Sequence, residues 1–333
     1  MVVLLHCFLF LLSAAVIWGL SGMLVSATDR VAKRYKKPGF AVAFLVLGIM
    51  TSIGEASVLV NATLEGVPQV SAGNLVGASL VIFLLIIPLL AMLGDGVPMN
   101  GSLRTRSLVL LLLIVALPSL LVLDGGLNPA EGLVMILLYF TLLYAVQKRK
   151  PAEEIIEQTI QQVGGELLHT RGFLHYRKAT LVDIEKIVIA GVLIFLAGRL
   201  LVDESVYFSN LLSIPASLVG LILLSIGTNI PELVIAIRCV VGRHKDIAFG
   251  DYMGSAAANT LLMGFLALAN GSFSLERSEF IPTFFLLSLG LALFFIFSRS
   301  KHNLSRKEGM TLLSIYAVFL IMQLSNVARF VGD

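Results

Sequence analysis

The sequence predicts an all-α polytopic membrane protein with ten transmembrane helices, arranged as two inverted repeats of five helices each. Hydrophobic residues make up 57% of the 333 residues, and charged residues only 14%, whereas an ordinary soluble domain carries about 25% charged residues. The apolar residues gather in long runs, and two polar segments within those runs match each other. A chain this apolar cannot cover its surface as a compact soluble domain, so we expect the bilayer to be its solvent.

Ten apolar runs are candidates for spanning helices, because a helix needs about 20 mostly apolar residues to cross the bilayer. Only helices and closed barrels satisfy the backbone in lipid, and these runs are too long for barrel strands. The first run has its positive cluster after it and no basic segment before it, so we interpret it as a span and not as a cleaved signal peptide. The runs are residues 2–26, 40–63, 70–93, 107–123, 131–146, 186–202, 211–240, 247–269, 280–297 and 309–325.

Lys and Arg predict the orientation of these spans. They are concentrated in alternate loops, whereas the opposite loops hold only Arg277 and Arg329. By the positive-inside rule, the basic loops face the cytoplasm and both termini lie outside it. The basic loops are 28–38, 94–106, 147–185, 241–246 and 298–308, and the opposite loops are 64–69, 124–130, 203–210, 270–279 and 326–333.

This orientation divides the chain into a first half at 1–146, a cytoplasmic linker at 147–185 and a second half at 186–333. We expect a polar surface helix at 151–163 within the linker. The net charge of +3 is too small to indicate a nucleic-acid partner, and the sequence leaves the oligomeric state open.

The two halves repeat each other without a gap, and the repeat register pairs residues 50–85 with residues 227–262 in order. Apolar helices match easily by chance at Leu and Ile, but not at Thr, Glu and two glycines in register. Because span 40–63 runs out of the cytoplasm and span 211–240 runs back into it, the repeats are inverted. Inverted repeats with interrupted helices place a substrate site near the middle of the bilayer. The identical pairs are Thr51/Thr228, Ile53/Ile230, Glu55/Glu232, Gly73/Gly250, Gly77/Gly254, Leu84/Leu261 and Leu85/Leu262.

Two acidic residues lie within otherwise apolar spans, Glu55 in the first repeat and Glu232 in the second. A carboxylate in mid-bilayer is costly unless it faces a cavity, a partner or an ion. Spacings of three and four residues put hydroxyl and amide groups on the same helical face as each glutamate. Such oxygens are ligands for hard cations, and the lack of imidazole and thiolate argues against zinc or copper. The two faces are Thr51, Ser52 and Glu55, and Thr228, Asn229 and Glu232.

Glycine and proline predict how these helices bend and pack. Gly54 and Pro231 come directly before the two glutamates, where a loosened helix can free a backbone carbonyl to join the site. Two G-x-x-x-G steps predict close packing of the third and eighth spans against the glutamate helices. The steps consist of Gly73, Gly77, Gly250 and Gly254.

These segments resemble the sodium/calcium exchanger superfamily. Residues 227–232, Gly-Thr-Asn-Ile-Pro-Glu, are similar to its G-T-S-x-P-E signature, and 50–55 are a weaker copy. Segments 73–77 and 254–259 resemble the second halves of the family's α-repeats. The resemblance implies that the Thr, Ser or Asn, and Glu positions bind cations, and that Ser255 and Asn259 complete the set. It also implies a compact prokaryotic-type member in the plasma membrane, whose first and sixth helices slide across the core.

The chain departs from the family pattern in both repeats. Ala78, Ser79 and Ile82 stand where the pattern has Ser, Asn and then Asn or Asp, so only Ser79 still offers an oxygen. Asn259 stands where many members have Asp. Asp251 replaces the usual Asn after a glycine, and we interpret it as a helix-packing or water-facing acid.

We therefore expect a secondary active cation antiporter that exchanges Na⁺ and Ca²⁺ at a midplane site built around two glutamates. A cation/proton exchanger of the same fold is the alternative, because protons can replace Na⁺ at carboxylates, and a non-transporting receptor or scaffold is a third. The chain shows no nucleophile–base pair, phosphate-binding loop or Cys/His cluster, so we expect no enzyme activity and no cofactor. The predicted cation ligands are Thr51, Ser52, Glu55, Ser79, Thr228, Asn229, Glu232, Ser255 and Asn259.

Overall fold

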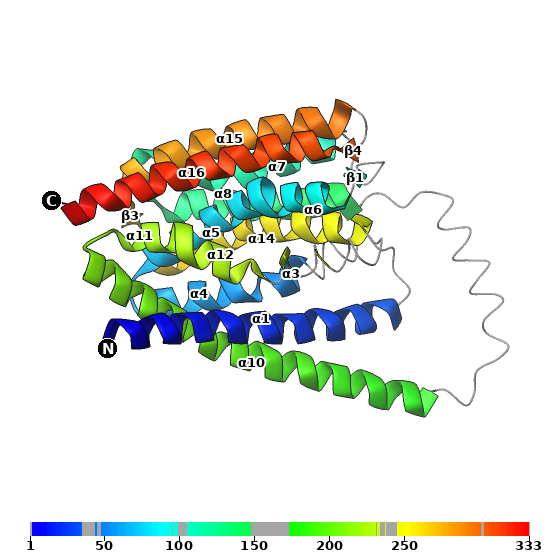
Figure 1. The fold of residues 1–333 in the computed structure, drawn as a ribbon. Helices are drawn as coiled ribbons and strands as arrows, with labels where there is room; N and C mark the ends of the chain where they lie inside the picture. Colours follow the sequence, from blue (N-terminus) through cyan, green and yellow to red (C-terminus); the bar gives the residue numbers. More distant parts are fainter. Residues whose placement is uncertain are drawn as a thin grey trace.

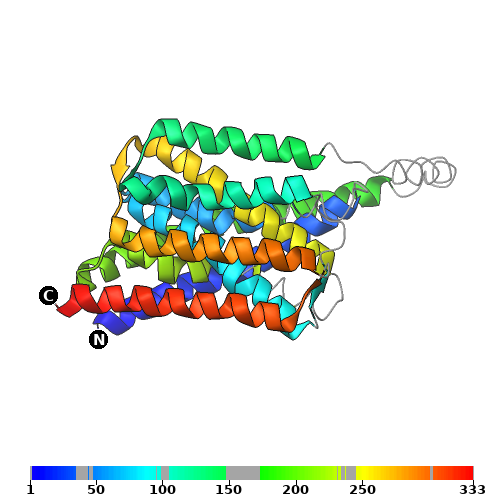
Figure 2. The same ribbon diagram turned by 90° about the horizontal axis from the view of Figure 1, so that it is seen from above.

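A computed structural model shows a bundle of long helices that run along one common direction (Figures 1 and 2). Seven of the helices are continuous over 17 residues or more within the described part of the chain. They are α1 (Val2–Arg34), α7 (Thr105–Leu121), α8 (Pro129–Gln147), α10 (Phe173–Leu212), α14 (Lys245–Asn270), α15 (Arg277–Ser300) and α16 (Arg306–Gly332). The structure describes residues 2–34, 44, 48–94, 96–98, 105–147, 173–230, 232–233, 237, 245–300 and 303–332.

Three further segments are built from shorter helical pieces. The first consists of α3 (Gly48–Thr51) and α4 (Ile53–Leu64). The second is α5 (Pro68–Val81), the π-helix η2 (Ile82–Ile86) and α6 (Ile87–Leu93). The third is α11 (Ala216–Val219), the π-helix η4 (Gly220–Leu224) and α12 (Ser225–Thr228). A single 3-10 turn, η3 (Val122–Asp124), follows α7.

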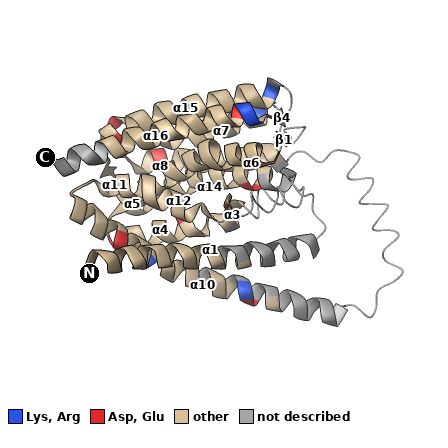
Figure 3. Ribbon diagram, viewed as in Figure 1, with Lys and Arg blue, Asp and Glu red and all other residues tan. Residues whose placement is uncertain are grey.

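The all-α membrane fold is confirmed. Seven helical stretches within the described residues are long and apolar enough to cross a membrane, and each overlaps one of the predicted runs. Two more predicted runs, 40–63 and 211–240, overlap the shorter apolar helices Ile53–Leu64 and Ala216–Thr228, and the run 186–202 lies inside α10. The count of ten spans stays a prediction. Among the described residues, charged positions lie mostly near the helix ends (Figure 3).

The helices at two predicted spans extend beyond the predicted bounds. Helix α1 continues to Arg34, past the predicted end at 26. Helix α10 runs from Phe173 to Leu212, so it occupies the last part of the predicted linker and the whole predicted loop 203–210. Hydropathy marks only the part of a helix that lies in hydrocarbon, whereas Ala, Leu, Lys, Arg and Glu favour continued helix outside it. The predicted surface helix at 151–163 lies outside the described residues.

Two short antiparallel ribbons join connections of the two halves. Strand β1 (Val97–Pro98) pairs with β4 (Asn303–Leu304), and β2 (Gly126–Leu127) pairs with β3 (Phe273–Ser274). Extended beyond the matched segments, the repeat register relates β2 to β4 and Val97 to Ser274. Strands β1 and β4 lie at one end of the bundle, and strand β3 lies at the other end (Figure 1). Equivalent positions of the two repeats therefore lie at opposite ends of the molecule.

The G-x-x-x-G steps pack as predicted. A Cβ atom added to Gly254 of α14 would collide with the carbonyl of Phe44, and one added to Gly77 of α5 would collide with the carbonyl of Leu221. Phe44 and Leu221 also correspond to each other in the repeat register. Helix α14 packs against α3, and α5 packs against α11, η4 and α12. Each repeat therefore places its second helix against the glutamate-bearing segment of the other repeat.

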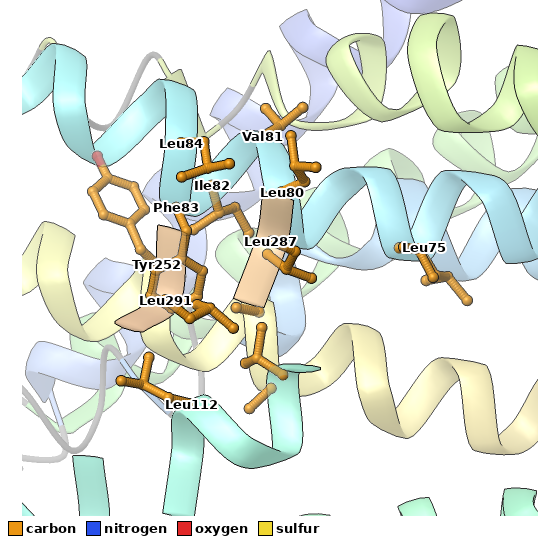
Figure 4. Close-up of a cluster of buried hydrophobic side chains, with 14 of the residues drawn as sticks. Leu75, Leu80, Val81, Ile82, Phe83, Leu84, Leu112, Tyr252, Leu287 and Leu291 are labelled. Atoms are coloured by element: carbon orange, nitrogen blue, oxygen red, sulfur yellow. The ribbon is translucent and has the colours of Figure 1, made fainter. Parts of the chain in front are cut away.

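The larger buried apolar cluster of the described residues includes η2. Ile82, Phe83 and Leu84 belong to it together with Leu287 and Leu291 of α15 (Figure 4). In the repeat register, Ile82 of this cluster stands where the second repeat has the polar side chain of Asn259.

Candidate cation site

Both glutamate-bearing segments leave α-helical geometry at equivalent residues. Ser52 separates α3 from α4 with ψ of 8°, and Asn229 follows α12 with the same ψ of 8°. We predicted the loosening at Gly54 and Pro231, but Gly54 lies inside α4 and Pro231 lies outside the described residues. The prediction for the first repeat is therefore wrong by two residues.

The side chains at these breaks bond back to the preceding turn. Ser52 Oγ donates to the Gly48 carbonyl at 2.8 Å, and Asn229 Nδ2 donates to the Ser225 carbonyl at 2.7 Å. Ser and Asn side chains commonly replace backbone partners in this way. The hydroxyl and the amide thus help to stabilise the interruption of each helix.

The two glutamates are fully buried between these segments and α14. Both carboxylates have 0% exposure, and they lie close enough to repel each other. Asn229 Nδ2 lies 3.4 Å from Glu55 Oε1, and Ser255 Oγ donates to Glu232 Oε1 at 2.9 Å. Both of these glutamate partners come from the second repeat.

The remaining predicted ligands form two links across the site. Ser52 Oγ lies 3.2 Å from Ser255 Oγ, which connects the first helix break to α14. Asn259 Nδ2 lies 3.4 Å from Ser79 Oγ, which connects α14 to α5. All nine predicted ligands are buried: Thr51, Ser52, Glu55, Ser79, Thr228, Asn229, Glu232, Ser255 and Asn259.

The two threonines point to residues that the sequence analysis left out of the site. Thr51 Oγ1 lies 3.3 Å from Asp251 Oδ1, and Thr228 Oγ1 lies 3.2 Å from Asn74 Oδ1. The repeat register relates these two contacts to each other. Asp251 has 0% exposure, so of the two interpretations given above the water-facing acid is wrong, whereas a helix-packing acid agrees with its contact to Thr51. Its alignment with Asn74, next to a repeated glycine, was the signal in the sequence that could have placed it here.

Several buried oxygens at this place lack a hydrogen-bond partner within the described residues. Buried polar atoms are nearly always bonded, so a group of unpaired oxygens requires an explanation. Carboxylate and amide oxygens are the ligands that hard cations take. The unpaired atoms are Glu55 Oε2, Asn229 Oδ1, Glu232 Oε2, Asp251 Oδ2 and Asn259 Oδ1.

The first repeat contributes fewer oxygens from its second helix. Ala78 stands at the position equivalent to Ser255, and Ile82 at the position equivalent to Asn259. Both side chains are fully buried, and Ile82 belongs to the apolar cluster around η2. Only Ser79, one residue after Ala78, presents a hydroxyl on that side.

The sequence profile described as sodium/calcium exchanger protein matches residues 5–147 and 186–325 of this chain. The sodium/calcium exchanger MaX1 of Methanosarcina acetivorans is 31% identical over 141 residues, which cover 42% of this chain and 40% of MaX1. The inner membrane protein YrbG of Escherichia coli is 27% identical over 241 residues, which cover 72% of each chain.

A solved structure of the sodium-calcium exchanger NCX_Mj, soaked with Na⁺ and Sr²⁺, has the same fold. The two chains superpose with a TM-score of 0.67 at 20% sequence identity, over 96% of this chain and 99% of the other.

Proposed function

The chain belongs to the sodium/calcium exchanger family, and from this premise we propose that it is a secondary active antiporter that exchanges Na⁺ for Ca²⁺ across a membrane. The unpaired carboxylate and amide oxygens between the two repeats are the observation that carries the proposal. They come from residues with at most 1% exposure, so a bound cation would be surrounded by protein.

The chemistry of these oxygens suits the proposed ions. Ca²⁺ takes six to eight oxygen ligands in proteins. Glu55, Glu232, Asn229 and Asn259 each offer one unpaired oxygen, and the hydroxyls of Ser52 and Ser255 lie 3.2 Å apart in the same site. Na⁺ is also a hard cation and takes the same kind of ligand, so the two ions compete for one set of oxygens.

Competition for the same carboxylates explains the coupling. Glu55 and Glu232 are buried and repel each other, and an uncompensated charge in the bilayer interior is expensive. The empty site therefore resists the change from one side of the membrane to the other. The site changes sides when Ca²⁺ or Na⁺ neutralises the carboxylates, so the flux of one ion requires the return flux of the other.

We also propose that the chain forms two inverted halves with both termini outside the cytoplasm. The ribbons at opposite ends of the bundle support the inverted relation (Figure 1), and the basic loops support the orientation. We propose residues 1–146 and 186–333 as the halves, with 147–185 as the linker. The gap in the family match between 147 and 186 agrees with this division.

The proposed moving parts are α1 and α10, which pack along each other (Figure 1). His6 Nδ1 of α1 lies 2.8 Å from Glu204 Oε2 of α10, and the His6 ring stacks on Tyr207 with 3.5 Å between the ring centroids. This pair can slide across the glutamate segments as one unit and expose the site to either side.

A cation/proton exchanger of the same fold is the second candidate. The observation that favours it is the loss of oxygen donors at Ala78 and Ile82, since a proton needs fewer ligands than a metal ion. Both candidates use the same glutamates, so only the driving ion separates them.

Purified protein in liposomes provides the test. An outward Na⁺ gradient should drive uptake of radioactive Ca²⁺, and the uptake should vanish when choline replaces Na⁺ inside. Uptake driven by a pH gradient alone would support the cation/proton exchanger. If neither gradient drives Ca²⁺ or Na⁺ flux, the antiport proposal is wrong and a scaffold or receptor remains.

A further inference from the structure

We propose that Asp251, Thr51 and Glu232 form a separate position for a monovalent cation, with Na⁺ as its occupant, and that the first repeat has no such position. This inference rests on the proposed antiport, because it adds an ion to the same buried site. A site with this position differs from a two-glutamate site in two ways. It contains a third acid, Asp251, and this additional acid comes from α14 alone.

Asp251 is the third acid of the site. Its side chain has 0% exposure, and Oδ2 has no hydrogen-bond partner within the described residues. Oδ1 accepts from Thr51 Oγ1 at 3.3 Å. The carboxylate of Glu232 is close enough to repel Asp251, and its Oε2 is also unpaired. One hydroxyl and two unpaired carboxylate oxygens therefore belong to neighbouring side chains.

The charge of Asp251 has no protein partner among the described residues. The close contacts found there between basic and acidic side chains connect His6 with Glu204 and Arg199 with Glu65, and neither contact includes a residue of the site. Burying a second acid beside Glu232 without compensation is expensive. A bound cation between the two carboxylates would remove this cost and would also satisfy both unpaired oxygens.

The charge balance selects a monovalent ion. One Ca²⁺ neutralises Glu55 and Glu232, which leaves a single negative charge on Asp251. A second Ca²⁺ would leave an excess positive charge, whereas one Na⁺ brings the total to zero. With Na⁺ alone, three ions neutralise the three carboxylates. One Na⁺ next to Asp251 therefore balances the charge of the site whether the two glutamates bind one Ca²⁺ or two Na⁺.

The equivalent contact in the first repeat cannot serve the same purpose. Asn74 Oδ1 accepts from Thr228 at 3.2 Å, and the unpaired atom of this amide is the donor Nδ2. An N–H group repels a cation, and the amide carries no charge. The extra position is thus confined to the side of the site formed by α14 and α3.

The test measures Na⁺-dependent thermal unfolding of the purified full chain in detergent, with choline chloride holding the ionic strength constant. An ion that binds only the folded protein raises the unfolding temperature with its concentration. The variant Asp251→Asn should need at least about tenfold more Na⁺ for the same rise in unfolding temperature, as is typical when a group that supports a metal site is removed. Its Ca²⁺-dependent shift should change much less.

The matched control is Glu279→Gln. Glu279 is also fully buried with one unpaired carboxylate oxygen, but its other oxygen accepts from Ser217 at 2.6 Å, away from the proposed ligands. This variant should titrate with Na⁺ as the wild type does. Equal weakening by both substitutions would show a general effect of removing a buried charge and would overturn the proposal.

Two further results would overturn it. If Asp251→Asn titrates with Na⁺ like the wild type, Asp251 holds no cation. If it weakens Na⁺ and Ca²⁺ equally, Asp251 belongs to one common site and not to a separate position. Should Asp251→Asn fail to fold, Thr51→Val decides, because the loss of its hydroxyl must still weaken Na⁺ more than Ca²⁺.

The liposome assay separates this inference from the proposed function. Wild-type protein that binds Na⁺ through Asp251 but drives no Ca²⁺ uptake would contradict the antiport and leave the position intact. Wild-type protein that exchanges Na⁺ for Ca²⁺, with Na⁺ binding that does not depend on Asp251, would contradict only the position.

Discussion

The two repeats provide matching backbones and unequal side chains. The breaks at Ser52 and Asn229 correspond, and so do the close contacts at Gly77 and Gly254. The helices that follow differ. Helix α14 presents Asp251, Ser255 and Asn259, whereas the equivalent positions of α5 and η2 carry Asn74, Ala78 and Ile82. Of the two helices, α14 therefore carries the Asp251 carboxylate and most of the other side-chain oxygens at these positions.

This difference shows which features the architecture needs twice and which it needs once. Gly77 and Gly254 both meet a backbone carbonyl, where a Cβ would collide, so packing requires the small residue in each repeat. A ligand is not required in each repeat, because both helices face the same site. One repeat can lose oxygens while the other keeps or gains them.

The largest expected effect concerns the inverted relation on which this comparison depends. In a chain with Cys7 and Cys239 replaced by Ser, a cysteine at Gln69 should react with a membrane-impermeant thiol reagent only from outside. A cysteine at Lys307 should react only from the cytoplasmic side, because it lies near the opposite ribbon. Reaction of both from one side would contradict the inverted arrangement.

The next effect compares the glutamates. Glu232→Gln and Glu55→Gln keep the shape of the side chain but remove its charge, so a bound cation loses one of the carboxylates that compensate it in the bilayer interior. Each variant should therefore lower Na⁺-driven Ca²⁺ uptake by roughly 100-fold or more. Glu279→Gln is the control, and its uptake should equal that of the wild type. Normal exchange by either site variant would remove that glutamate from the mechanism.

A smaller effect is expected from a carboxylate added to α14. Asn259 Oδ1 is unpaired, and a hydrogen bond or ligand contact to a charged group is about twice as strong as one to a neutral group. Asn259→Asp should raise apparent Ca²⁺ affinity roughly tenfold or change the reversal potential in proteoliposomes. Asn270→Asp, at the end of the same helix, should do neither. If Asn259→Asp leaves affinity and reversal potential unchanged, Asn259 does not line the site.

The smallest effect tests the asymmetry directly. Ser255→Ala makes the second repeat like the first and removes the hydrogen bond to Glu232, worth about 1 kcal/mol. We expect apparent Ca²⁺ affinity to fall roughly fivefold. Ala78→Ser makes the reciprocal change in the first repeat and should raise the affinity by less. Opposite signs in Ca²⁺ titrations would sharpen the comparison, whereas equal signs would show that the two positions are not functionally equivalent.

The sequence predicted the fold well wherever hydropathy and repetition applied. The internal match between 50–85 and 227–262 correctly indicated that Gly77 and Gly254 make equivalent contacts. Helix ends were less predictable, as α10 shows: its polar ends continue the helix outside the apolar run. The break at Ser52 was also displaced from Gly54, because a side-chain bond to the preceding turn, and not glycine flexibility, stabilises the interruption.

The repeat pattern and the resemblance were enough to name nine candidate ligands. That these residues bind a cation stays a prediction. Asp251 shows where that reasoning stops. An acid that stands where an amide is usual offers no sign of its surroundings in a single sequence, and only the fold shows that it contacts Thr51. The repeat alignment indicated only that the position of Asp251 is equivalent to that of Asn74.

The two ribbons also limit how the molecule can move. One joins the connection after α6 to the connection before α16, and the other joins the connections before α8 and α15. Rotation of one half against the other would shear backbone hydrogen bonds at both ends of the bundle at once. Displacement of α1 together with α10 leaves both ribbons intact. In the proposed movement, the boundary between the rigid frame and the moving element would therefore run across the sequence repeat, since α1 comes from one proposed half and α10 from the other.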